Sequence, residues 1–334
     1  MECSRCKLSP ILEGDAPIVH YCNRDCQRAD WSQHKTLCRN LQDRTTLYRV
    51  ATVAQKLYYI CRELTWAQYD IQSVERAENK LILHGRVSED ATWPADYKVF
   101  PSHLFPAEAD RRDREATLSY RTCRDSASWM VEFVEGMLKE IIVQASDIEV
   151  RTKNNKRLTR MPLPGVWYMG DEVRHNVLKL QLRSGELFAV DLSGAQFGHH
   201  DPVTSWNEYE KTRVREVLDV DAAPSPDKIL QVDDYSFQKM AFFVRKVTQP
   251  HEARRRIHLD VLEAMNLHFL EWQADEHLSL KSLWSLGEKD FQKKHLDLVD
   301  YIEWKFHSVI QHRWYTEHGR QLAQKIKGRW VFGK

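Results

Sequence analysis

Six residues near the N-terminus have the types and spacing of metal ligands. They follow the pattern Cys-x2-Cys-x15-Cys-x3-Cys-x7-His-x3-Cys and occupy positions Cys3, Cys6, Cys22, Cys26, His34 and Cys38. Thiolate and imidazole are the donors that tetrahedral zinc prefers, and a two-residue gap lets both sulfurs of a turn face one ion. The second and third pairs each have a spacing of four residues, so each pair would lie on one face of a short helix. The pattern predicts a zinc-binding segment over residues 1–40.

The distribution of the cysteines favours metal binding over disulfide bonding. Five of the seven cysteines fall within the first 38 residues, and Cys61 and Cys123 are scattered over the rest of the chain. A cluster at short spacings is typical of a metal site in a reducing compartment. The first residues contain no apolar signal core, and no apolar run of 18 residues occurs. We therefore expect no membrane span and a cytoplasmic or nuclear location. So short a segment cannot build a core, so the metal must contribute the folding free energy.

The second half of this segment carries a more specific pattern. It reads Tyr-Cys-Asn-Arg-Asp-Cys-Gln-Arg-Ala-Asp-Trp-Ser-Gln-His-Lys over residues 21–35, and Cys38 closes it. This pattern resembles the MYND-type zinc finger, and the resemblance covers residues 3–38. The family implies a cross-braced site for two zinc ions with eight ligands. It also implies an adaptor module that binds short proline-containing peptides of partner proteins. The closed structural zinc would offer no position for catalysis.

The number of ligands departs from the family pattern. The family has two Cys-x2-Cys pairs before the Tyr-Cys, whereas this chain has one, so six ligands fill one zinc site and half of another. If the first pair here is the family's first pair, the full site consists of Cys3, Cys6, Cys22 and Cys26. His34 and Cys38 would then lack two partners. Three side chains could complete a weaker second site, namely Glu13, Asp15 and His20. Alternatively, the last pair holds no zinc, or the natural chain starts upstream of residue 1.

Charge and glycine content argue against several function classes. Lys and Arg total 49 and Asp and Glu total 48, so the net charge is +1. A general nucleic-acid or anionic-membrane binder would carry a basic excess, so neither partner is indicated. The chain has 12 glycines and contains neither a dinucleotide-binding nor a phosphate-loop motif. The cofactor motif and Gly-rich start of a lysine methyltransferase domain are also missing from the sequence.

Three residues in the middle of the chain have the types and order of a cysteine-enzyme triad. Cys123 is predicted at the first position of a helix, where the helix dipole stabilises a thiolate. His175 lies early in a predicted strand and would accept the thiol proton, and Asp191 on the next strand would orient the imidazole. In this order of residues, the region about 120–200 resembles papain-like and transglutaminase-like cysteine enzymes. That resemblance implies a hydrolase or acyltransferase as the alternative function.

The expected hairpin geometry keeps two of these residues apart. A two-residue turn at Ser184 and Gly185 would place Asp191 opposite Leu178, on the other face from His175. A bulge or a longer loop would be needed to bring the carboxylate to the imidazole. Without one, the three residues belong to ordinary helix–hairpin packing with a buried cysteine.

The hydrophobic periodicity predicts an α+β fold with four regions. These are a zinc finger over 1–40, a helical and irregular connecting region over 41–110, an α+β region over 111–217 and a helical region over 218–334. The predicted helices span 41–65, 122–141, 206–217, 235–248, 252–273 and 289–326. A β-hairpin is predicted over 173–193 and a linker over 218–228. Thr122 and Asp125 are expected to form a capping box at the start of the second helix.

Overall fold

The computed structural model describes residues 2–15, 19–66, 69–87, 100–162, 173–222, 264–265 and 267–313. The predicted helix over 235–248 lies outside these residues, as do most of the predicted helix over 252–273 and the end of the helix over 289–326. Within the described residues the fold is α+β, as the sequence predicted.

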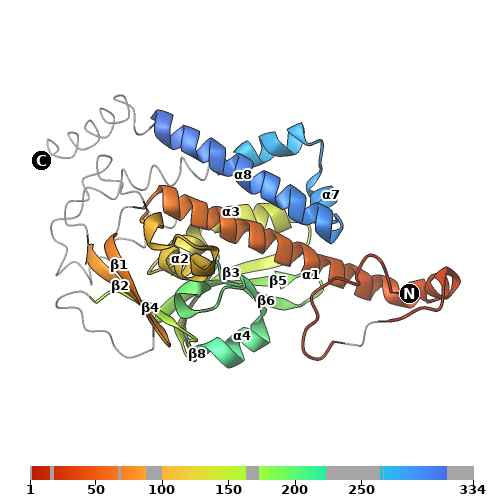
Figure 1. Ribbon diagram of the computed structural model, residues 1–334. Helices are drawn as coiled ribbons and strands as arrows, with labels where there is room; N and C mark the ends of the chain where they lie inside the picture. The colour runs from red at the N-terminus through yellow and green to blue at the C-terminus, as the bar shows by residue number, and fades with distance from the viewer. Residues whose placement is uncertain are drawn as a thin grey trace, which may run out of the picture.

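One long helix, α1 (Arg24–Leu64), joins the N-terminal segment to the rest of the molecule. Figure 1 shows α1 running along the body and continuing beyond it, with the N-terminus beside the part of α1 that projects from the body. The Asn23 side chain caps the helix by accepting the backbone N–H groups of Asp25 and Cys26, at 3.0 and 2.9 Å. No Gly or Pro interrupts the helix, so nothing stops it at residue 40. The finger and the helix predicted over 41–65 therefore share one continuous element.

The centre of the body is a five-stranded antiparallel sheet of order β7-β6-β5-β3-β8. Its strands are β3 (Ile142–Thr152), β5 (Arg174–Leu182), β6 (Leu187–Val190), β7 (Val203–Ser205) and β8 (Val214–Ala222). Helix α3 (Cys123–Leu138) packs against β5 and β3, and α1 packs against α3.

The two faces of this sheet bury separate sets of side chains, as the two-residue period of a strand requires. Leu178, Leu180 and Leu182 of β5 belong to the large core that includes α1 and α3. Val177 belongs instead to a smaller cluster with Trp206 and Tyr209 of helix α4 (Trp206–Arg213). The sheet thus lies between a layer of long helices and α4 (Figure 1).

Smaller elements complete the described body. A three-stranded sheet has the order β1-β2-β4, from β1 (Tyr69–Ala77), β2 (Lys80–Val87) and β4 (Leu158–Arg160). Further helices are α2 (Arg111–Leu118), α7 (Leu280–Trp284) and α8 (Glu288–Arg313), with the 3-10 turns Ser102–Leu104, Glu108–Asp110 and Gly194–Phe197. Residues 267–275 are helical as well. Arg49 of α1 ties α7 and α8 to the long helix. It donates to the carbonyl of Trp284 and forms an ion pair with Glu288, both at 2.9 Å.

Three local predictions differ from the structure. The helix predicted over 206–217 ends at Arg213, and the chain continues as β8, which pairs with β3 where a linker was predicted. The connecting region predicted as largely irregular contains the hairpin β1–β2. Helix α3 begins at Cys123 as predicted, but Thr122 makes no capping bond, because its hydroxyl bonds to Tyr58 and to the carbonyl of Ser119.

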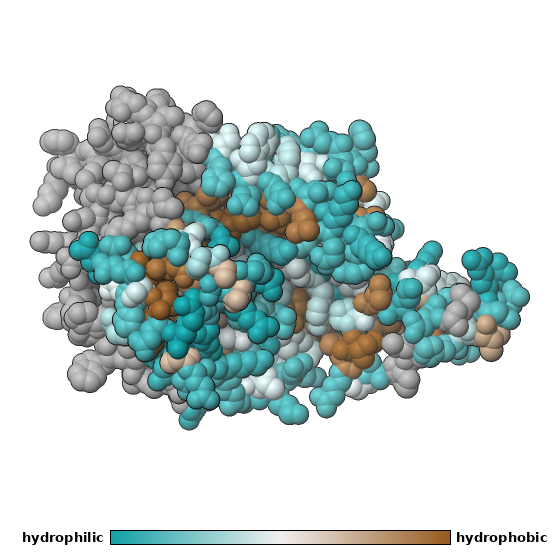
Figure 2. All heavy atoms as spheres, in the orientation of Figure 1, coloured by the Kyte–Doolittle hydropathy of each residue, from teal (hydrophilic) through white to brown (hydrophobic). Residues whose placement is uncertain are grey.

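Among the described residues, no helix combines the length and apolarity that a membrane crossing requires. Figure 2 shows a largely hydrophilic face with apolar atoms gathered in a few patches.

Candidate functional site

Four of the six predicted ligands lie close together in the N-terminal segment. The ligand atoms of Cys3, Cys6, His34 and Cys38 all lie within 4.8 Å of one another. The Cys3 and Cys38 sulfurs are 3.8 Å apart, and the Cys6 sulfur is 3.5 Å from Nε2 of His34. A tetrahedral zinc with bonds of about 2.3 Å to sulfur and 2.0–2.1 Å to nitrogen would impose separations of about 3.8 and 3.5 Å. The donor set and its spacing therefore fit one zinc ion.

Two simple local structures position these ligands. Cys3 and Cys6 lie in a tight turn in which the Cys3 carbonyl accepts the N–H groups of Cys6 and Lys7. His34 and Cys38 lie one helical turn apart on α1, so both side chains point from the same face. The four side chains are buried, with exposures between 0 and 8%. A turn and a helix face thus bring four buried ligand atoms together.

The protonation of the site supports the need for a cation. Burial and the neighbouring sulfurs raise the pKa of Cys6 and of Cys38. Burial also acts to raise the pKa of Cys3, but the Arg5 backbone N–H and His34 outweigh it and lower that pKa to about 7. Three thiolates cannot share this volume without a positive charge among them. Zinc would supply that charge and would favour all three thiolates at once.

The grouping of the ligands differs from the sequence-based expectation. Cys22 and Cys26 do not share a site with Cys3 and Cys6, and both are exposed at the outer end of α1. Cys26 precedes His34 by eight residues, which is about 12 Å along a helix. One ion cannot be shared across that distance, so the ion that Cys3 and Cys6 bind would be shared with His34 and Cys38 alone.

The proposed additional ligands do not assemble into a second cluster within the described residues. Asp15 pairs with Arg44 of α1, which also bonds to Glu186 of the hairpin, at 2.8 and 2.7 Å. This guanidinium holds the pKa of Asp15 below its ordinary value. Asp15 therefore connects the N-terminal segment to the body. His20 lies 3.9 Å from Glu2 on the surface.

The outer surface of the segment is rich in exposed apolar side chains. Large ones with exposures of 38% or more are Leu8, Ile11, Val19, Trp31 and Leu37. The Trp31 ring also packs against His34, with centroids 6.0 Å apart. The Tyr21 ring stands edge-on to the same His34 ring, and its hydroxyl donates to Asp30. Ligands and exposed aromatic surface are thus held by the same few residues.

A second constellation lies where β5 begins and β6 ends. Nε2 of His175 is 2.9 Å from Oδ1 of Asp191, and both side chains are almost fully buried. At this distance the two groups form an ion pair when the imidazole is protonated. Cys123, the first residue of α3, is half-buried and adjoins the ring closely enough to affect its pKa. Burial alone would lower the pKa of His175, but Asp191 and then Cys123 outweigh it and raise the pKa to about 10.

The hairpin turn explains how Asp191 reaches His175. Leu182 pairs with Glu186, so three residues rather than two form the turn. The register continues to Leu178 opposite Val190. One step further, Asp191 lies opposite Val177, which shares a face with His175. The predicted two-residue turn was therefore wrong by one residue, and the correction moves the carboxylate to the face of the imidazole.

Several residues that support this constellation escaped the sequence analysis. The Tyr209 hydroxyl of α4 donates to Oδ2 of Asp191 at 3.1 Å, and the Ser193 N–H approaches Oδ1 at 3.3 Å. The Phe197 ring stands edge-on to His175, with centroids 4.8 Å apart. The hydroxyls of Ser193 and Ser126 bond at 3.0 Å and tie this loop to α3. Tyr209 and Ser126 belong to other elements, α4 and α3, so spacing in the sequence gave no signal for them, whereas Ser193 and Phe197 follow Asp191 in the same loop.

Comparison with known proteins identifies the first of these two sites. A closed zinc site with three cysteines and one histidine, built from a turn and a helix face, defines a structural zinc finger. Residues 1–38 match the family model of the MYND finger. The N-terminal segment is therefore a MYND-type zinc finger. No curated protein sequence and no solved structure matches the chain. The resemblance of residues 120–200 to papain-like and transglutaminase-like enzymes thus gains no support from relatives.

Proposed function

We propose that this protein is a zinc-stabilised interaction protein whose MYND-type finger binds a partner protein. The supporting observation is the buried cluster of four zinc-type ligands beneath exposed apolar side chains such as Trp31. MYND fingers in general are protein-interaction modules. Exposed apolar surface on so small a unit is typical of a binding face. A proline-containing peptide of a partner is the ligand that the resemblance implies.

A binding measurement with the full chain tests this function. The probe is a fluorescent synthetic proline-containing peptide, and anisotropy reports its binding. We expect binding to the zinc-loaded chain, loss of binding after chelation, and at least tenfold weaker binding for Trp31→Ala. Trp304→Ala is the matched control, because Trp304 is 63% exposed on α8, outside the finger. Equal binding by the loaded and chelated chains would contradict the proposal.

Cys22 and Cys26 remain candidate ligands of a second, incomplete zinc site. Their sulfurs lie four residues apart near the start of α1 and are exposed, so they could contribute two ligands. Two thiolates alone do not complete a tetrahedral structural site. We therefore expect one tightly bound zinc per chain.

A second candidate function is that of a cysteine hydrolase or acyltransferase. The observation that favours it is the buried His175–Asp191 pair beside the half-buried Cys123. A positively charged imidazole next to a sulfur at a helix N-terminus stabilises a thiolate nucleophile. Cys123 would add to an acyl carbon, His175 would give its proton to the leaving group, and Asp191 would hold the imidazole in place.

Alkylation of Cys123 by iodoacetamide tests this second function. Peptide mass spectrometry separates Cys123 from the exposed Cys22 and Cys26. We expect rapid labelling of Cys123 at neutral pH and at least tenfold slower labelling in His175→Gln. His84→Gln is the control, because His84 pairs with Glu75 on the surface. A Cys123 that reacts only after denaturation, as expected for the buried Cys61, would refute the triad.

A further inference from the structure

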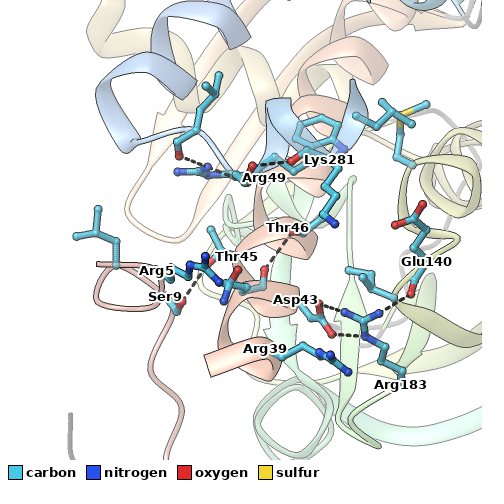
Figure 3. A pocket seen from close by; sticks show the side chains of 18 of the residues that line it. Arg5, Ser9, Arg39, Asp43, Thr45, Thr46, Arg49, Glu140, Arg183 and Lys281 are labelled. Carbon is cyan, nitrogen blue, oxygen red and sulfur yellow. Dashed lines mark hydrogen bonds and ion pairs between the residues drawn. The ribbon is translucent and has the colours of Figure 1, made fainter. Parts of the chain in front are cut away.

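A large groove lies between the finger and the body. Its volume is about 1150 Å³. The finger turn, the middle of α1, the end of α3 and the region of α7 all line it (Figure 3). Single ligand pockets commonly measure about 300–1,000 Å³, so this groove has room for a segment of polypeptide.

The lining of this groove is strongly basic. Seven cationic side chains line it, namely Arg5, Lys35, Arg39, Arg49, Lys139, Arg183 and Lys281. Three carboxylates line it as well, namely Asp43, Glu140 and Glu288. The chain as a whole has a net charge of +1, so this excess is local to the groove.

Two of the three carboxylates that line the groove form ion pairs with arginines of the same lining. Asp43 receives two bonds from Arg183, at 2.7 and 2.8 Å, and Glu288 pairs with Arg49. The five other cations have no acidic partner within the described part of the chain and are exposed. Glu140 is the carboxylate that remains to oppose them there. Figure 3 shows Arg39 and Arg183 near one another on one side of the groove and Lys281 on another.

Apolar side chains lie among these cations. Leu8 and Trp31 contribute from the finger, with exposures of 62 and 39%. Met137, Leu280 and Leu286 contribute from the body. A ligand with acidic groups alone would leave this apolar surface in water, so the occupant should carry both kinds of group.

We propose that this groove binds an acidic segment of a partner protein that carries at least one large apolar side chain. Charge complementarity supports this occupant, because the five cations without an acidic partner offer a positive surface where the finger meets the body. The proposal rests on the proposed function, because the finger supplies one wall. It adds that the body supplies the other wall, through Lys139 and Lys281, so the isolated finger would not be sufficient.

Zinc bound at the finger would fix the finger wall of the groove. Arg5 lies within the Cys3–Cys6 turn, and Lys35 and Arg39 directly follow the ligands His34 and Cys38. The body wall does not depend on these ligands, because Lys139 follows α3 and Lys281 is in α7. Variants of the body wall can therefore test the groove while the finger keeps its zinc.

The experiment measures binding of a fluorescent synthetic peptide, in which runs of Asp and Glu flank a Leu-Phe pair, to the zinc-loaded full chain. We expect binding that weakens steeply with salt, because exposed charges are screened over about 10 Å at 0.1 M. The double variant Lys139→Glu/Lys281→Glu should bind at least tenfold more weakly and keep a wild-type zinc content. Lys211→Glu on α4, outside the groove, should bind as the wild type does.

Two comparison peptides decide the chemistry. The amide version, with Asn and Gln in place of Asp and Glu, should not bind, and an acidic peptide without Leu-Phe should bind more weakly. If the acidic peptide fails to bind while the proline peptide still binds, the groove proposal is overturned and the finger function stands. Tighter binding of single-stranded DNA or of anionic lipid vesicles than of the acidic peptide would also overturn it.

Discussion

Cys38 provides the sharpest test of the zinc site among single residues. Its side chain is fully buried, and its sulfur is 3.8 Å from that of Cys3. Cys38→Ser should lose zinc, because a hydroxyl is a poor substitute for a thiolate ligand. Cys22→Ser and Cys26→Ser are the matched controls and should retain about one zinc per chain. Metal analysis of the purified full chain, after dialysis against a weak chelator, measures the difference.

The opposite pattern of zinc loss would contradict the grouping of Cys38 with Cys3, Cys6 and His34. If Cys26→Ser lost zinc and Cys38→Ser retained it, the ion would be held by Cys22 and Cys26 at the start of α1. Loss of half the metal in every variant would instead indicate two coupled sites.

The His175–Asp191 pair predicts a particular dependence of stability on pH. The folded pKa of His175 is raised from 6.5 to about 10, and that of Asp191 is lowered from 3.8. Stabilisation by the histidine is therefore complete below pH 6.5 and is lost as the pH rises toward 10. Stabilisation by the aspartate is complete above pH 3.8 and is lost as the pH falls through the lowered pKa.

Urea denaturation at several pH values measures this effect. Asp191→Asn should lower the free energy of unfolding by about 3–5 kcal/mol near pH 6, because it leaves a buried partner uncompensated. The difference from the wild type should shrink between pH 7 and pH 10. A difference that stays constant over this range would show that His175 is not charged in the folded protein.

The residue types at both sites could be predicted from the sequence, but their partners could not. Cysteine and histidine spacing predicted six candidate ligands, because short spacings constrain local geometry, and four of the six lie together in the structure. Which pair on α1 meets Cys3 and Cys6 depends on how the N-terminal turn folds back, and no spacing encodes that. Likewise, the order of Cys123, His175 and Asp191 gave the candidates, whereas the contact with Tyr209 arises from tertiary packing.

The β5–β6 hairpin shows how one backbone position controls an entire element. Gly185 has φ +87° in the three-residue turn, a conformation that favours glycine. Gly185→Ala should therefore destabilise the protein by about 1–2 kcal/mol. Gly136→Ala is the matched control in helix α3, where a methyl group meets nothing within 4 Å. That substitution should stabilise by about 0.5–1 kcal/mol. Thermal unfolding of both variants would test the opposite signs, and two shifts in the same direction would contradict the argument.

Element types were predicted more reliably than element ends. The alternation of β5 and the periodicity of α3 identified both from the sequence, because each buries one face. The end of α4 was misplaced because residues 214–222 pair with β3, a contact between positions far apart in the chain. The predicted turn at Gly185 was one residue too short. This single residue was enough to place Asp191 on the wrong face of the sheet in the prediction.

For the molecule as a whole, removing zinc should release the finger without unfolding the body. The finger depends on its metal, whereas the body has a large core that includes the second half of α1. With a strong chelator we expect rapid hydrogen exchange over residues 2–38 and continued protection after residue 47. The melting temperature of the body should change by no more than about 2 °C. Simultaneous loss of protection in α3 and β5 would show that finger and body unfold as one unit.

The continuity of α1 also has a mechanical consequence. A helix of 41 residues is about 60 Å long, and no glycine or proline gives it a hinge. The finger is thus mounted on a stiff rod whose other end is embedded in the body, and Arg44 braces it against the hairpin turn. A protein bound at the finger is therefore kept at a fixed distance from the body and in a fixed orientation relative to it. The helix therefore sets the orientation of the finger relative to the body. Inserting a single residue into α1 between finger and body would rotate any protein bound at the finger by about 100° around the axis of α1.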